Sequence, residues 1–219
     1  MAYVDGCSLD DLIETQGPLN EDHARYIFQQ KVLIIDCLHV HYNIMHRDLK
    51  LSNFIAWRKK SEEGMVTVSL CDFGWAKQSG SGGPTVTKTG TRRYIAPEVL
   101  NSPADTWYDG KAADMYSLGV CLFKMIFAQF PRTQDEDIVP AGVVSPQCAQ
   151  LLRRLLQPNP AQRITLDELW ADPWFDDEFR AMRQYNEDRM AEAESRIVEQ
   201  SEEDVADLIK EMWGVPAQN

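Results

Sequence analysis

Apolar side chains recur every three or four residues along 21–42, which is the spacing of one face of an α-helix. The positions on this face are Ala24, Ile27, Phe28, Lys31, Val32, Ile35 and Leu38. Residues 112–127 are apolar almost all round, which is typical of a helix buried in the middle of a domain. A third helix is predicted for 145–156, because Pro158 and Pro160 would end it.

Strands and loops are predicted between these helices. Residues 54–57 and 65–71 predict two strands, joined by the polar turn 58–64. Residues 79–84 are rich in glycine and serine, so a loop is expected there.

Acidic residues crowd the chain from 176 to 203, and a solvated helical face is the simplest interpretation. The last segment predicts a short amphipathic helix, because 201–204 resembles a capping box. Its apolar stripe consists of Val205, Leu208, Ile209 and Met212. A stripe of this kind needs a surface on which to pack.

Composition excludes some classes of partner. The chain has 219 residues with 44% apolar content, enough for one sizeable core. The net charge of −12 argues against a nucleic acid partner, because a phosphate backbone requires clustered Lys and Arg. No apolar run suggests a signal peptide or a membrane span. The five cysteines form no CxxC pair, so reduced thiols in the cytoplasm or nucleus are expected.

Three short motifs follow one another in a fixed order. His46–Asn53 reads His-Arg-Asp-Leu-Lys-Leu-Ser-Asn, Asp72–Gly74 reads Asp-Phe-Gly, and Ala96–Glu98 reads Ala-Pro-Glu. They match the catalytic loop, the magnesium-binding motif and the end of the activation segment of protein kinases. Each motif alone is weak, whereas the ordered set with a strand pair between the first two is specific.

These residue types suit phosphoryl transfer, which requires the protein to position reactants and neutralise charge. Asp48 is expected to orient the substrate hydroxyl and accept its proton. Asn53 and Asp72 offer the hard oxygen ligands that Mg²⁺ prefers. Lys50 can reach the transferring phosphate.

The chain therefore resembles the C-terminal lobe of a eukaryotic serine/threonine protein kinase. Within that superfamily it is most similar to the osmotic-stress-activated subfamily of plant sucrose-non-fermenting-related kinases, through Cys71–Gly74, Tyr94–Leu100 and Tyr108–Lys111. The resemblance implies an α+β, mainly helical fold with a short catalytic β-hairpin and without the N-terminal lobe. It implies a kinase lobe over 1–175, beginning at the hinge, and an acidic helical regulatory extension over 176–219.

The same resemblance implies further roles. ATP and Mg²⁺ are the expected cofactors and a protein is the expected substrate. The nucleotide is expected to contact Tyr3, Val4, Lys50, Asn53, Ile55 and Asp72, with Asn53 and Asp72 as the metal ligands. Thr91 belongs to the loop that contacts the substrate residue after the acceptor. Asp114 and the pair Glu98–Arg163 are expected to be architectural, and the tail helix is expected to pack on an N-lobe or a regulator.

Control by an upstream kinase is a further expectation. Arg47 precedes Asp48, and a phosphate on the activation segment can pair with such an arginine. Thr87 and Thr89 are the candidate phosphosites, although ordinary loop threonines are an equally good interpretation.

The sequence also departs from the family pattern. The 219 residues contain no glycine-rich loop, strand lysine or helix glutamate of a kinase N-terminal lobe, and alanine stands at position 2 where a hinge glutamate is common. Ser52 replaces a glutamate linked to basic substrates, and Arg92–Arg93 replaces the usual Pro-Ala. The chain alone is therefore expected to be a poor catalyst.

Two interpretations compete. In the first, the chain represents a protein serine/threonine kinase that lacks its upstream part. In the second, it is a pseudokinase-like binding or regulatory module. The set Asp48, Asn53 and Asp72 favours the first, because a pure binding module has no chemical need for it. A small-molecule or lipid kinase would explain the metal ligands but not Lys50, Thr91 and Glu98 together.

Overall fold

The computed structural model describes residues 6–58, 66–78, 88–103, 106–132, 138–140 and 142–183. Its described residues up to 175 belong to one unit, and residues 176–183 belong to another. Several predictions lie wholly or mostly outside the described residues: the nucleotide contacts of Tyr3 and Val4, the turn 58–64, the loop 79–84, the phosphosite Thr87, the acidic helical face 176–203 and the helix carrying the stripe 205–212. None of the described helices is both long and apolar enough to cross a membrane.

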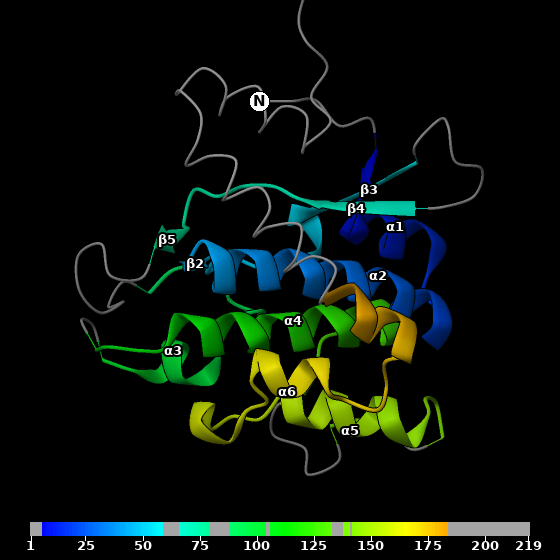
Figure 1. Ribbon diagram of the computed structural model, residues 1–219. Helices are drawn as coiled ribbons and strands as arrows, with labels where there is room; N and C mark the ends of the chain where they lie inside the picture. Colours follow the sequence, from blue (N-terminus) through cyan, green and yellow to red (C-terminus); the bar gives the residue numbers. More distant parts are fainter. Residues whose placement is uncertain are drawn as a thin grey trace, which may run out of the picture. The chain divides into compact units, whose positions relative to one another are not determined.

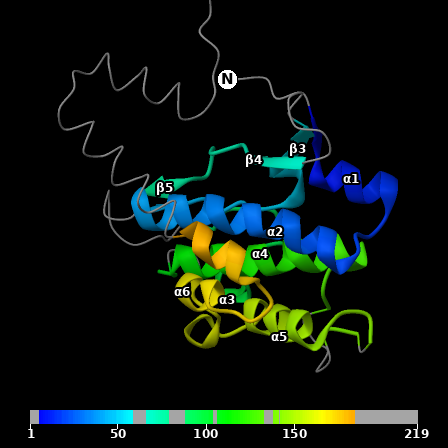
Figure 2. The same ribbon diagram turned by 45° about the vertical axis from the view of Figure 1, so that its right-hand side comes forward.

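Two long helices form the middle of the larger unit. Helix α2 (Glu21–Asp36) lies beside α4 (Gly110–Phe127), and α5 (Pro146–Leu155) packs on α4 from the other side (Figures 1 and 2). Nearly every residue of α4 is buried, which confirms the buried helix predicted for 112–127. The helix predicted for 145–156 is also confirmed, with Ser145 as its N-cap.

The helix predicted over 21–42 changes geometry near its end. After α2 the chain continues as a π-helical turn, Cys37–His41. The wider turn follows Asp36, whose carboxylate accepts a hydrogen bond from the indole Nε1 of Trp170 at 2.8 Å. Single π-turns of this kind are frequent near functional sites.

A three-stranded antiparallel sheet covers α2. Its order is β1 (Cys7–Ser8), β3 (Phe54–Arg58) and β4 (Val66–Leu70). The pair β3–β4 confirms the predicted hairpin, with Ile55 opposite Ser69. Along β3 the side chains alternate, so that Phe54 and Ala56 are buried while Ile55 is half-buried on the opposite face. The side-chain amide of Gln30 bonds to Val66 O and Val68 N, which closes the free edge of β4.

Shorter elements complete the unit. A second sheet pairs β2 (Ile44–Met45) with β5 (Lys77–Gln78). The short helices are α1 (Leu9–Gln16), α3 (Pro97–Asn101), α6 (Leu166–Trp170) and the 3₁₀ turns Leu51–Asn53 and Pro160–Gln162. Two-residue strands are too short to show a period, which is why β1, β2 and β5 were not predicted.

Lys31 is the unusual member of the core. It is fully buried on α2, where its Nζ lies 4.0 Å from the centroid of the Phe54 ring and next to the thiol of Cys121. Burial lowers the pKa of the Lys31 ammonium, and the neighbouring Cys121 opposes this shift. An amine held in an apolar core costs free energy that a hydrocarbon side chain would not.

Replacing Lys31 with methionine is therefore expected to stabilise the fold by about 1–3 kcal/mol near neutral pH. The unfolded chain binds a proton at Lys31 that the folded chain binds less well, so wild-type stability rises with pH up to the unfolded pKa of about 10.4. The advantage of Lys31→Met should shrink over that range. Urea unfolding of both proteins at pH 7 and pH 10 measures this, and a less stable methionine variant would contradict it.

Candidate functional site

The loop 46–53 lies between β2 and β3 and contains three of the predicted site residues, Asp48, Lys50 and Asn53. Arg47, a non-glycine residue, has a left-handed φ of 66°, which costs about 1–2 kcal/mol. Asp114 of α4 offsets this cost. Its buried carboxylate accepts hydrogen bonds from the backbone N–H of His46 and of Arg47, both at 2.8 Å. The carboxylate also lies 2.9 Å from Nε2 of His39. Asp114 thus has the expected architectural position.

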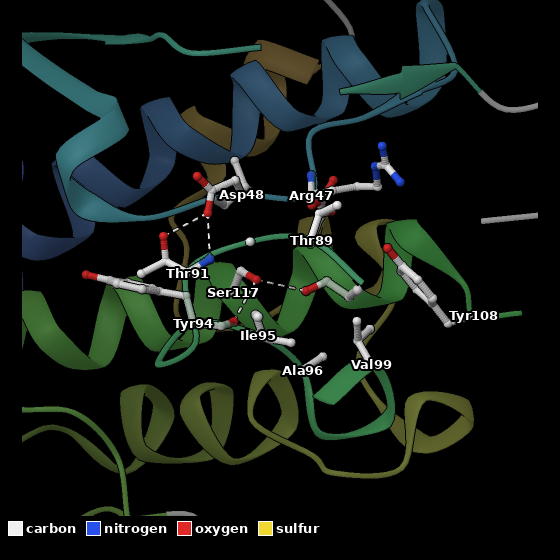
Figure 3. A pocket seen from close by; sticks show the side chains of 14 residues that line it. Arg47, Asp48, Thr89, Thr91, Tyr94, Ile95, Ala96, Val99, Tyr108 and Ser117 are labelled. Carbon is white, nitrogen blue, oxygen red and sulfur yellow. Dashed lines mark hydrogen bonds between the residues drawn. The ribbon is translucent and has the colours of Figure 1, made fainter. Parts of the chain in front are cut away.

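Asp48 is 5% exposed and is held from two sides. Its Oδ1 accepts hydrogen bonds from the backbone N–H of Thr91 at 2.8 Å and from the Thr91 hydroxyl at 2.9 Å. Its Oδ2 accepts one from Nζ of Lys50 at 2.8 Å. Figure 3 shows Thr91 turned toward Asp48. The structure therefore brings Thr91 of the predicted substrate loop against two residues of the catalytic-loop motif, Asp48 and Lys50.

Gly90 permits this approach. Its φ is 111°, which strains any side-chain-bearing residue. A Cβ at this position would lie 2.8 Å from the carbonyl oxygen of Arg47. Only glycine lets the segment with Thr91 come close enough to bind Asp48.

Asn53 directly precedes β3, and Asp72 lies two residues after the end of its partner strand β4. The Asn53 amide nitrogen donates to Asp48 O at 2.9 Å, and the Asn53 backbone carbonyl accepts from Cys71 N at 2.9 Å. Asp72 follows Cys71 directly with a φ of 62°, and its side chain is exposed. Since the Asn53 nitrogen is engaged, its side-chain oxygen is the atom left for a ligand.

The donor set fits a magnesium ion. The Asn53 amide oxygen and the Asp72 carboxylate are hard ligands, and Mg²⁺ usually takes one or two protein oxygens and completes its shell with water and phosphate. Among the residues that the structure describes, no three His, Cys, Asp or Glu side chains cluster in a way that could hold a metal ion. A Mg²⁺ ion held by these two protein oxygens would complete its shell with water and phosphate oxygens.

His46 connects the loop to the segment after Asp72. Its ring packs edge-on against Phe73, with centroids 5.1 Å apart. Its Nε2 lies 3.3 Å from the carbonyl oxygen of Cys71, which requires a proton on that nitrogen. Burial lowers the pKa of His46, and nearby carboxylates, that of Asp114 foremost, oppose the shift. A neutral imidazole suits this position. No pattern in the sequence marks His39 or the His46–Phe73 contact.

The predicted pair between Glu98 and Arg163 is present. Both terminal guanidinium nitrogens donate to the carboxylate, at 2.7 and 2.8 Å, and the Arg163 side chain is fully buried. Arg163 also donates to the carbonyl oxygens of Ala112 and Gln157. The pair thereby joins α3 to the start of α4 and to the loop before α6.

Thr89 does not suit the phosphosite predicted for it. It is 8% exposed and lines a cavity of about 20 Å³ next to Arg47, Tyr94 and Val99 (Figure 3). Its side chain turns inward beside Gly90, so its hydroxyl is closed off from an upstream kinase. Arg47 is partly engaged as well, since its Nε donates to Trp75 O at 2.7 Å. Thr87 stays a prediction.

Comparison with known proteins gives one family. The family described as protein kinase domain matches residues 1–175. The chain is 35% identical to the serine/threonine-protein kinase SAPK4 and 37% to SAPK7, both of Oryza sativa subsp. japonica, over 192 residues. It is 38% identical to CBL-interacting protein kinase 3 of the same organism over 190 residues.

The matched regions cover a larger share of this chain than of its relatives. Each covers 80% of this chain, but only 51% of SAPK4 and SAPK7 and 40% of CBL-interacting protein kinase 3. The chain thus spans about half the length of the curated relatives that it matches.

Proposed function

Because this chain belongs to the protein kinase domain family, we propose that it carries the catalytic site for phosphoryl transfer from ATP to serine or threonine of a protein substrate. One observation carries the proposal: Asp48 is fixed by Thr91 on one oxygen and by Lys50 on the other. The names of the relatives SAPK4 and SAPK7, both serine/threonine-protein kinases, support the choice of acceptor.

Asp48 orients the acceptor hydroxyl and takes its proton as the bond from oxygen to the γ-phosphorus forms. The bond between that phosphorus and the β-phosphate oxygen breaks, and ADP leaves. Lys50, with 22% of its side chain exposed, places its positive charge beside Asp48, where the transferring phosphoryl group builds up negative charge. Asn53 and Asp72 would hold Mg²⁺, which neutralises the nucleotide phosphates when bound.

Ile55 is proposed as an apolar contact for adenine. It lies on the face of β3 opposite Phe54, where it is half-buried and flanked by Ser8 and Ser69. Nucleotide contacts of Tyr3 and Val4 are proposed from the family resemblance alone. The tail is likewise proposed to bind an N-lobe or a regulator.

The test is transfer of labelled γ-phosphate with Mg²⁺ to matched peptides that contain serine, threonine or tyrosine. It is run with the 219-residue chain and with the same chain joined to a kinase N-terminal lobe. Labelling of serine and threonine but not tyrosine, mainly by the joined protein, is expected. Transfer by neither protein would leave a pseudokinase-like binding module as the better account.

Thr91 is expected to set the position of Asp48 during transfer. Thr91→Val keeps the size and the backbone bond but removes the hydroxyl, so kcat should fall about tenfold to a hundredfold, as expected when a catalytic group is slightly misplaced. Thr91→Ser keeps the hydroxyl and should stay within about threefold of wild type. Steady-state kinetics of the joined protein measures this, and equal rates for valine and serine would contradict it.

A further inference from the structure

Two adjacent arginines stand at the tip of the turn that holds Thr91 against Asp48. The backbone N–H of Tyr94 donates to Thr91 O at 2.8 Å, so Arg92 and Arg93 are the central residues of this turn, and both are exposed. The far end of the turn is also fixed, since the Ser117 hydroxyl donates to Tyr94 O at 2.9 Å. The two cations are thus held on a rigid turn beside the proposed catalytic aspartate.

The sequence of this turn is basic, whereas the chain as a whole is acidic. The chain has 34 acidic and 22 basic residues, yet 88–97 contains three basic side chains and no acidic one. Within the part of the chain that the structure describes, Arg92 and Arg93 form no ion pair with a carboxylate. The third cation, Lys88, donates to the carbonyl oxygen of Leu100.

Arg93 makes a cation–π contact at the base of the turn. Its guanidinium carbon lies 4.9 Å from the centroid of the Phe130 ring, which packs edge-on against Tyr94 at 5.2 Å. Such a contact is an attraction between the cation and the ring, and it leaves the charge of Arg93 without a carboxylate to neutralise it. The contact therefore favours one position of the Arg93 side chain before any ligand arrives.

The carboxylates nearby are mostly engaged. Asp48 accepts from Thr91 and Lys50, and Asp10 of α1 is paired with Lys124. Ser52, exposed next to Asn53, brings no charge. The exposed carboxylate of Glu14 is close enough to act electrostatically on the Tyr94 hydroxyl. Because Glu14 would attract a basic side chain instead, the test includes a peptide with a basic residue after the acceptor.

From this arrangement, and resting on the proposed function, we propose that Arg92 and Arg93 select protein substrates with an acidic side chain directly after the acceptor. Thr91 touches Asp48, and Arg92 and Arg93 follow it in the same exposed turn. An acceptor oriented by Asp48 would therefore lie beside this turn, and the side chain after the acceptor is the one proposed to meet the two guanidinium groups. A carboxylate would be matched there by charge-assisted hydrogen bonds.

Equilibrium binding tests this proposal without requiring turnover. Three fluorescent peptides share one sequence and differ only after the acceptor serine, which is followed by glutamate, glutamine or lysine. Their affinities for the full 219-residue chain are measured by fluorescence anisotropy at low salt and at about 0.5 M NaCl, where the Debye length is roughly 4–5 Å. The variants are Arg92→Gln, Arg93→Gln and both together. The matched control is Arg153→Gln, an exposed arginine of α5 far along the chain from the turn.

The glutamate peptide should bind about three to ten times more tightly than the glutamine peptide, and the lysine peptide most weakly. The double variant should bind the three peptides with equal affinity. High salt should reduce the differences in affinity, and Arg153→Gln should keep them. Equal affinity of the three peptides, no binding of any, or a glutamate preference that survives in the double variant would overturn the proposal. A preference in binding without any phosphoryl transfer would count against the proposed function alone, and transfer without preference would count against this inference alone.

Discussion

Replacing Asp48 with asparagine is expected to lower kcat for peptide phosphorylation by about a thousandfold or more, within the range that general-base catalysis contributes. The asparagine oxygen can still accept the two bonds from Thr91, but its amide would face Nζ of Lys50 with a donor instead of an acceptor. The proton acceptor is lost while the shape of the site is kept.

The measurement is steady-state phosphorylation of a serine peptide by the chain joined to a kinase N-terminal lobe. Asp22→Asn is the matched control, because the Asp22 side chain is 86% exposed and lies on α2, outside the site. It should leave kcat unchanged. An Asp48→Asn rate within about tenfold of wild type would show that this carboxylate is not the base.

Breaking the pair Glu98–Arg163 is expected to be the most destabilising change, at about 3–5 kcal/mol for Glu98→Ala. The Arg163 side chain is 0% exposed, so removing Glu98 leaves a buried guanidinium without its carboxylate. Bonds to the carbonyl oxygens of Ala112, Gln157 and Pro158 remain, but they do not neutralise its charge.

Urea unfolding of Glu98→Ala, Arg163→Met and the double variant gives a coupling free energy for the pair. The double variant should be clearly more stable than the sum of the two losses predicts, because it buries no lone charge. Asp22→Ala, which breaks an exposed pair with Arg25, should cost less than about 1 kcal/mol. A Glu98→Ala loss as small as that of Asp22→Ala would contradict this account.

The main helices and the catalytic hairpin were predictable because their patterns are long and local. Helix α4 and the strand pair β3–β4 begin and end close to the residues predicted for them. Lys31 was predicted to lie on the buried face from its spacing alone, and it is buried although it is a lysine. Its position along the helix therefore predicted its burial better than the polarity of its side chain.

Other features depend on contacts between distant segments, which no local pattern encodes. The pair β2–β5 joins residues on either side of the catalytic hairpin. The bond from Thr91 to Asp48 spans 43 positions and needs Gly90 at positive φ. Thr89 looks like any loop threonine in the sequence, and only the fold shows that it is turned inward.

The most direct test of the central claim is magnesium-dependent transfer of labelled γ-phosphate to serine, measured for the joined protein and for its Asp48→Asn and Asp72→Asn variants. The account predicts transfer by the wild type with Mg²⁺, loss of transfer when Mg²⁺ is chelated, and near-complete loss in both variants with their folds intact. Transfer that persists in either variant at the wild-type rate would show that these residues do not form the catalytic site.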